Sequence, residues 1–156
     1  MRQTLALALL LSLACASGSI QTGRTEDSST DDFDVEIEQA NEPLTMRGNT
    51  TTDLRFLITV RNRTDAPWTI ERIALQSMGG GTYTMPVRTR AFDRVVAPGA
   101  AEEFEFWATV DLAEDAILAR APITMRTTLY AKNDGDTRTE EFMQRINGRV
   151  SIARND

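Results

Sequence analysis

The sequence has no histidine and only one cysteine, Cys15, among its 156 residues. These two side chains are the ones most often used for proton transfer, nucleophile activation and transition-metal ligation. Their scarcity excludes most hydrolase triads and zinc sites. Catalysis by carboxylates alone needs two converging acids, whereas neighbours such as Glu102-Glu103 or Glu140-Glu141 diverge on a strand. We therefore expect a protein that is not an enzyme and that uses no cofactor or metal.

The apolar run from Leu5 to Leu11 is too short to cross a bilayer, which takes about 20 residues. It follows a single positive charge at Arg2 and ends in small residues. This arrangement is typical of a secretory signal peptide, which is removed on export. We assign residues 1–14 to this signal peptide.

Cys15 has no second cysteine with which to form a disulfide. The segment Ser12-Leu13-Ala14-Cys15, followed by Ala16, resembles the lipobox of bacterial lipoproteins, with Ser12 where that family usually has leucine. The resemblance implies lipidation at Cys15 and attachment to a membrane, and the non-acidic Ala16 implies the periplasmic face of the outer membrane. The same residues also fit an A-x-A site with cleavage before Ser17, which would leave a secreted or periplasmic protein.

Bulky apolar side chains are scarce from residue 15 to residue 32, where Ser, Thr and acidic residues dominate. Such a segment cannot bury enough surface to offset the entropy of ordering, so we interpret residues 15–32 as a flexible acidic tether. The remaining residues, 33–156, have the length of one domain.

Positive charge is also in short supply. Removal of the signal peptide takes away only Arg2 and leaves 16 basic against 23 acidic residues, a net charge of −7. Nucleic-acid recognition needs a basic surface, so we expect no nucleic-acid partner.

Period-two alternation of apolar and polar residues is the main pattern of the domain. It predicts strands at Phe33-Val35-Ile37, at Leu54 to Asn62 and from Phe104 to Val110. A one-residue slip between Trp68 and Leu75 indicates a bulge near Glu71. Weaker patterns predict further strands at residues 82–87, 92–96, 123–131 and 137–146.

Turn-forming residues separate these strands. Asp111, with Glu114 three residues later and Pro122 beyond, predicts a short capped helix between two strands. The segment Asn133-Asp134-Gly135-Asp136 predicts a type I′ hairpin. Half of a calcium loop is the alternative for this segment, but EF-hand spacing is absent.

These elements predict an all-β fold: a single antiparallel β-sandwich of about seven strands with one short crossover helix. The stretch Val60 to Pro67, followed later by Val96-Ala97-Pro98-Gly99 and a long strand, resembles the immunoglobulin-like modules of bacterial surface proteins. This resemblance implies an immunoglobulin-like sandwich. The turn before Pro67 is also similar, more faintly, to the water-stress domain of late-embryogenesis-abundant type 2 proteins.

Two aromatic residues fall out of phase with the core. Phe104, Phe106, Ala108 and Val110 occupy one face of their strand, which directs Trp107 to the other face, and Tyr130 is likewise out of phase with Leu129. An aromatic ring on a solvent face is either covered by a neighbouring segment or offered to a partner. We consider Trp107 and Tyr130 a candidate contact patch for an envelope protein or a glycan; the alternative is cover by the Gly79–Gly81 loop or by the helix.

The sequence therefore favours a non-catalytic, membrane-tethered envelope lipoprotein that acts as an accessory or binding module through its β-sandwich surface. A water-stress protectant without a specific ligand is the alternative, by resemblance to the late-embryogenesis-abundant domain. A carboxylate-dependent hydrolase is the remote alternative.

Overall fold

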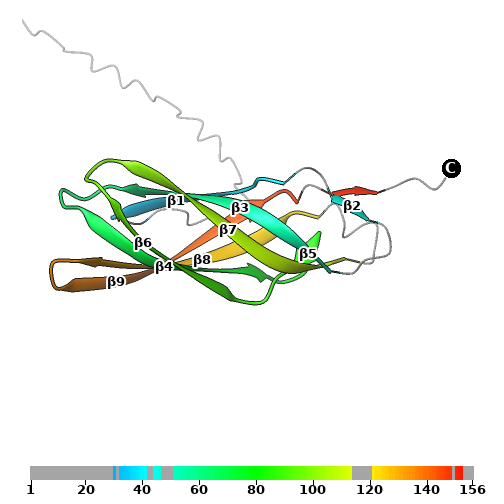
Figure 1. Cartoon of the computed structure of the whole chain (residues 1–156). Coiled ribbons are helices and arrows are strands. Elements are labelled where there is room, and N and C mark those ends of the chain that lie inside the picture. The colour runs from blue at the N-terminus through cyan, green and yellow to red at the C-terminus, as the bar shows by residue number, and fades with distance from the viewer. Residues whose placement is uncertain are drawn as a thin grey trace, which may run out of the picture.

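The alternating apolar residues become the facing surfaces of two sheets. The computed structural model describes residues 30, 32–41, 44–46, 51–113, 121–148 and 150–152. Within them, two four-stranded antiparallel sheets pack face to face (Figure 1). The predicted antiparallel β-sandwich is confirmed, with eight strands in its two sheets.

The first sheet has the strand order β1-β3-β7-β5 and is called the β3 sheet below. Its strands are β1 (Phe33–Gln39), β3 (Thr51–Asn62), β7 (Ala101–Leu112) and β5 (Tyr83–Thr84). The second, called the β4 sheet, has the order β6-β4-β8-β9. Its strands are β6 (Arg88–Val96), β4 (Trp68–Met78), β8 (Ile123–Asn133) and β9 (Asp136–Ile146). A short parallel pair, β2 (Leu44–Met46) and β10 (Val150–Ile152), lies at one end of the sandwich (Figure 1).

The core contains the residues that the alternation predicted. On β3 and β7 the buried positions alternate strictly with exposed or half-buried ones, and the completely buried side chains include Leu54, Phe56, Ile58, Val60 and Phe104. Because every second residue of a strand faces the same side, one face of each sheet supplies this core. The strand phases predicted for β1, β3, β4 and β7 are therefore confirmed.

The slip in β4 is a β-bulge. Ile70 pairs with Ala131 of β8 and Arg72 with Tyr130, so Glu71 is the extra residue. The edge strand β6 is irregular at the same level, and its Asp93 has a positive φ of 47°. The bulge predicted near Glu71 is confirmed, and it restores the core phase so that Ile70 and Ile73 are both buried.

A buried asparagine organises the turn between β3 and β4. The Asn62 amide donates to the carbonyl oxygens of Ala66 at 2.8 Å and Val96 at 3.0 Å. Its Oδ1 accepts from the backbone N–H and the hydroxyl of Thr64. The Thr64 hydroxyl oxygen in turn accepts from the Trp68 indole N–H at 3.1 Å. The polar side chain is thus fully paired, as its burial requires.

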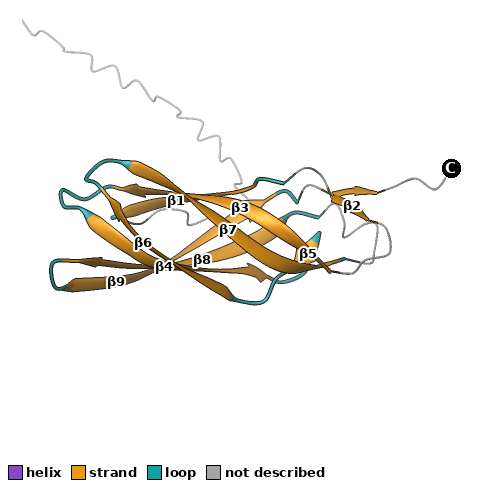
Figure 2. Cartoon of the chain, viewed as in Figure 1, coloured by secondary structure: helices purple, strands orange, loops and turns teal. Residues whose placement is uncertain are grey.

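Three local predictions need correction. No helix occurs among the described residues (Figure 2), and Asp111 is not a helix cap, because it lies within β7 and pairs with Thr51. Residues 114–120, where the rest of the helix was predicted, lie outside the described residues. The β8–β9 turn is not type I′, which needs positive φ at both central residues: Gly135 has φ +102°, but Asp134 is not positive. The strand predicted at residues 82–87 shortens to Tyr83–Thr84, because Met85 instead hydrogen-bonds to Ser77 at the end of β4.

Candidate functional site

Trp107 lies on the outer face of the β3 sheet. It stands on β7 between the buried residues Phe106 and Ala108, and 49% of its surface is exposed. Among the described residues it is the only aromatic side chain among the exposed large hydrophobics, which also include Met78, Val87 and Val95. The outward orientation predicted for Trp107 is confirmed.

Polar groups on β3 and β7 hold this indole in place. Its Nε1 donates to Glu105 Oε1 at 2.6 Å, and the other oxygen of Glu105 lies 3.6 Å from Arg55, the residue opposite Trp107 on β3. On the next pair, the Thr109 hydroxyl donates to Asp53 at 2.6 Å. The result is an open aromatic ring with donors and acceptors around it, an arrangement that can bind by stacking and hydrogen bonding.

Tyr130 does not join Trp107 in one patch. It stands on β8 of the β4 sheet, between the buried residues Leu129 and Ala131, and so faces away from the core on the opposite side of the sandwich. The Arg72 guanidinium lies 4.0 Å from the centroid of its half-buried ring. The proposal of a single patch made of Trp107 and Tyr130 is therefore wrong, because their strands belong to different sheets.

The Gly79–Gly81 loop, considered above as a cover for these aromatics, packs elsewhere. A Cβ atom on Gly81 would come within 3.0 Å of the Pro122 carbonyl oxygen and the Ile123 side chain. Close packing against the start of β8 explains why glycine stands at this position. Trp107 remains half exposed with the loop in this place.

The adjacent carboxylate pairs are engaged with separate neighbours. Glu102 lies 3.7 Å from Arg94, whereas Glu103 points to the outer face of the β3 sheet. Glu140 accepts a hydrogen bond from Thr30, and Glu141 lies 3.8 Å from Arg126. Within the described ranges no three acidic or cysteine side chains gather as metal ligands, and no helix is long and apolar enough to cross a membrane.

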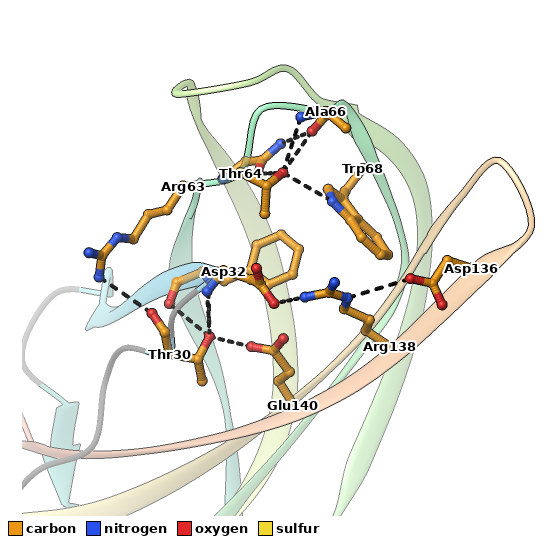
Figure 3. A network of polar contacts seen from close by, with 11 residues as sticks. Thr30, Asp32, Arg63, Thr64, Ala66, Trp68, Asp136, Arg138 and Glu140 are labelled. Atoms are coloured by element: carbon orange, nitrogen blue, oxygen red, sulfur yellow. Dashed lines mark hydrogen bonds and ion pairs between the residues drawn. The ribbon is translucent and has the colours of Figure 1, made fainter.

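A polar network ties the start of the domain to β9 (Figure 3). The Thr30 hydroxyl donates to Glu140, and Asp32 forms an ion pair with Arg138. The Arg138 guanidinium lies 4.8 Å from the centroid of the Trp68 ring and 3.9 Å from Asp136. The chain therefore joins the sandwich along the side formed by β1 and β9.

A hollow lies at one end of the β4 sheet. It has a volume of about 520 Å³ and lies beside the β8–β9 turn, lined by Pro67, Thr69, Val95, Lys132 and residues 133–137. A hydrogen bond from Lys132 to Glu71 at 2.7 Å, together with the charge of Glu71, raises the pKa of Lys132. Its cation is therefore paired rather than offered to a ligand.

Sequence reasoning missed the roles of the arginines on β6. Arg90 and Arg94 donate from their Nη1 atoms to the backbone carbonyl oxygens of Glu105 and Glu103, at 3.0 Å and 2.7 Å. The same reasoning missed Gln144, whose side chain contacts the backbone of Ile37. Residue spacing carries no signal for either contact, since each joins strands of different sheets.

Comparisons with known proteins give a similarity of fold only. No family model matches the chain, and no curated protein matches it. Among solved structures, it is similar to a protein from Archaeoglobus fulgidus, with 12% identity over 76% of this chain and 97% of that one and a TM-score of 0.49. It is also similar to the GAE domain of yeast GGA1, with 17% identity over 76% and 93% and a TM-score of 0.46. A FixG-related protein from Vibrio parahaemolyticus follows, with 13% identity over 78% and 100% and a TM-score of 0.35.

Proposed function

We propose that this protein is a non-catalytic envelope lipoprotein, tethered to a membrane through Cys15, that acts as an accessory or binding module through its β-sandwich surface. The observation that carries the proposal is the half-exposed indole of Trp107, fixed by Glu105 on the outer face of the β3 sheet. Aromatic side chains of this kind are enriched among the residues that dominate binding energy at interfaces.

The contacts at the start of the described domain support the proposal. Thr30 and Asp32 are bound to β9, so the described chain begins on the β1–β9 side of the sandwich. About 15 residues separate Cys15 from Thr30, and a tether of that length, if flexible as its composition predicts, would span on the order of 20 Å. Such a tether would hold the domain close to the membrane.

The tether is tested by fractionation of cells that express the full chain. We expect the protein to partition with membranes and the Cys15→Ser variant to be released, because acyl chains contribute about 0.8 kcal/mol per buried methylene. Intact-mass analysis provides the second measurement. A mature chain that begins at Ser17 without acyl groups would contradict the lipoprotein proposal.

The contact surface is tested by placing a photocrosslinking amino acid at position 109, beside the intact Trp107 on the outer face of β7, or, as the matched control, at position 130. These positions lie on opposite sheets, so a partner of the Trp107 face crosslinks at the first and not at the second. The Trp107→Ser variant should lose the same partner while its melting temperature stays nearly unchanged, since solvent-face substitutions usually alter stability by less than about 0.5 kcal/mol. Equal crosslinking at both positions would contradict a specific contact through Trp107.

A further inference from the structure

Among the described residues, one edge of the β3 sheet has no neighbouring strand over most of its length. β7 pairs with β3 from Ala101 to Asp111, but on its other side only Asp111 and Leu112 pair, with β5. No strand of the described chain pairs with this side between Ala101 and Val110. An unpaired edge of this length presents backbone donors and acceptors to any extended chain that approaches it.

Arginines of β6 line this edge. Arg88, Arg90 and Arg94 pair with Leu75, Ile73 and Ile70, which places them on the core-facing side of the β4 sheet. They remain exposed, because β6 lies beside the edge of the β3 sheet. Arg94 reaches the carbonyl oxygen of Glu103 and Arg90 that of Glu105, so the guanidiniums occupy the acceptors that an added strand would use.

The three arginines are held to different degrees. Arg94 has an acidic neighbour, Glu102 at 3.7 Å, and an aromatic one, Phe104 at 5.0 Å from its ring centroid. Within the described part of the chain, the Arg90 side chain has only the ring of Phe92, at 5.4 Å, besides its hydrogen bond. The Arg88 side chain forms no hydrogen bond or ion pair with the described residues. The cover of the edge therefore weakens from Glu103 toward Trp107.

Arginine can pair with the carbonyl oxygens of such an edge but not with its N–H groups, because its side chain has donors and no acceptor. The contacts to Glu103 and Glu105 show that the odd-numbered residues of β7 point their backbone groups outward. In an antiparallel strand the same orientation recurs at every second residue, which includes Trp107 and Thr109. The arginines at Glu103 and Glu105 cannot accept a hydrogen bond from the N–H groups there, and no described strand pairs with Trp107 or Thr109 on this side.

We propose that this edge binds an extended acidic segment of a partner protein, which adds to β7 as a further strand. The partner's backbone N–H groups replace the guanidiniums at the carbonyl oxygens of Glu103 and Glu105, and its carbonyl groups accept from the N–H groups of β7. Alternate carboxylates of the segment pair with the released Arg88, Arg90 and Arg94, and the other side chains lie on the outer face beside Trp107. The proposal goes beyond the Trp107 contact, since it depends on the backbone of β7 and on β6.

Charge favours this occupant over two others. A second copy would bring its own arginine row against this one if two β7 edges paired about a two-fold axis, and the like charges would repel. A nucleic acid has a sugar-phosphate backbone without amides, so it cannot add to β7 as a strand. An acidic peptide supplies both the backbone pairing and the opposite charge.

The test uses the full chain carrying Cys15→Ser and a fluorescein-labelled heptapeptide with alternating aspartate and valine, measured by fluorescence anisotropy. We expect saturable binding that weakens with added salt. A peptide with lysine in place of aspartate should not bind. A peptide with N-methylated amides at every second position should bind at least about tenfold more weakly, because it keeps the charge but cannot pair along the strand. Equal binding of the N-methylated peptide, or no binding of the acidic one at 1 mM (about 4 kcal/mol of affinity), would overturn strand addition.

Protein variants locate the site. The Arg88→Gln/Arg90→Gln double variant should bind the acidic peptide at least about tenfold more weakly, while Arg145→Gln, an exposed arginine on β9, should retain it. Equal losses in the two proteins would show a general charge effect and refute the site. Sedimentation adds a further outcome: if the double variant self-associates and the parent binds no peptide, the arginines serve only to keep two edges apart, and the proposal fails.

Discussion

Different kinds of side chain cover the two sides of the sandwich where edge strands of the two sheets meet. On the β1–β9 side, the Gln144 amide accepts from the Ile37 N–H at 2.8 Å and donates to the Ile37 carbonyl oxygen at 3.5 Å. On the same edge of β1, the Thr30 backbone N–H donates to the Phe33 carbonyl oxygen, and the Phe33 N–H donates to the Thr30 hydroxyl oxygen. Arg138 covers Trp68. On the β6–β7 side, the cover consists of two arginines that each reach one carbonyl oxygen.

The difference lies in what each side chain can offer. A glutamine amide has both a donor and an acceptor, so it can replace a neighbouring strand at one residue, whereas a guanidinium only donates. The glutamine therefore satisfies both backbone groups of Ile37, whereas the arginines leave the N–H groups of β7 without acceptors. A sheet edge whose carbonyl oxygens are covered can therefore still bind a partner that offers acceptors to its N–H groups.

The largest expected change in stability comes from removing an aromatic side chain on the β1–β9 side, compared with one on the β6–β7 side. Trp68 is buried against Phe33 at a ring distance of 5.9 Å, so Trp68→Ala should cost about 3–5 kcal/mol. Phe92, on the open side, is only partly buried, and Phe92→Ala should cost about 1–2 kcal/mol. Urea unfolding of both variants measures the difference. Equal costs would mean that the two sides are equally well packed.

A smaller effect is expected for the polar covers themselves. Gln144→Ala should lower the free energy of unfolding by about 1 kcal/mol, because it leaves the backbone of Ile37 without its partner. Arg90→Gln should lower it by less than about 0.5 kcal/mol, since that contact is exposed to water. A cost for Arg90→Gln as large as that for Gln144→Ala would contradict the proposed difference in sealing.

Hydrogen exchange compares the two edges without mutation. The amide proton of Ile37 is bound by Gln144, whereas that of Trp107 faces the open edge, and we expect the former to exchange at least about tenfold more slowly. Two-dimensional NMR under native conditions gives both rates in one sample. The acidic heptapeptide should then slow exchange at Trp107 and leave Ile37 unchanged.

The smallest effect at neutral pH concerns Tyr83, at the point where β5 closes the open edge. Its hydroxyl donates to Gln39 at 3.4 Å, so Tyr83→Phe should cost only about 0.5 kcal/mol. Burial raises the pKa of Tyr83 above its ordinary value of 10.0. Since the unfolded chain ionises this group first, its contribution is present below pH 10 and is lost as the pH rises further. Alkaline unfolding monitored by far-UV circular dichroism should therefore shift to higher pH in Tyr83→Phe.

Local rules account for the strands and for the outward position of Trp107. Every second residue from Leu54 to Val60 and from Phe104 to Val110 is apolar, and side chains of a strand alternate between faces, so these core positions follow from the sequence. The bulge at Glu71 follows in the same way from the broken phase. The helix cap at Asp111 was wrong because pairing with Thr51 and Thr84 extends β7 past that residue, and tertiary pairing outweighs a local capping preference.

Strand order, by contrast, was decided only when the sheets formed. Alternation shows that Trp107 and Tyr130 face away from the core, but it does not assign their strands to sheets. The pairing of β7 with β3 and of β8 with β4 places the two rings on opposite faces of the sandwich. The contacts of Gln144 with Ile37 and of Arg90 with Glu105 likewise join residues of different sheets. The sequence by itself determined which face of each strand is buried, because that depends on neighbouring residues. The tertiary structure alone decided which edges lie side by side, because that depends on the long-range pairing of strands.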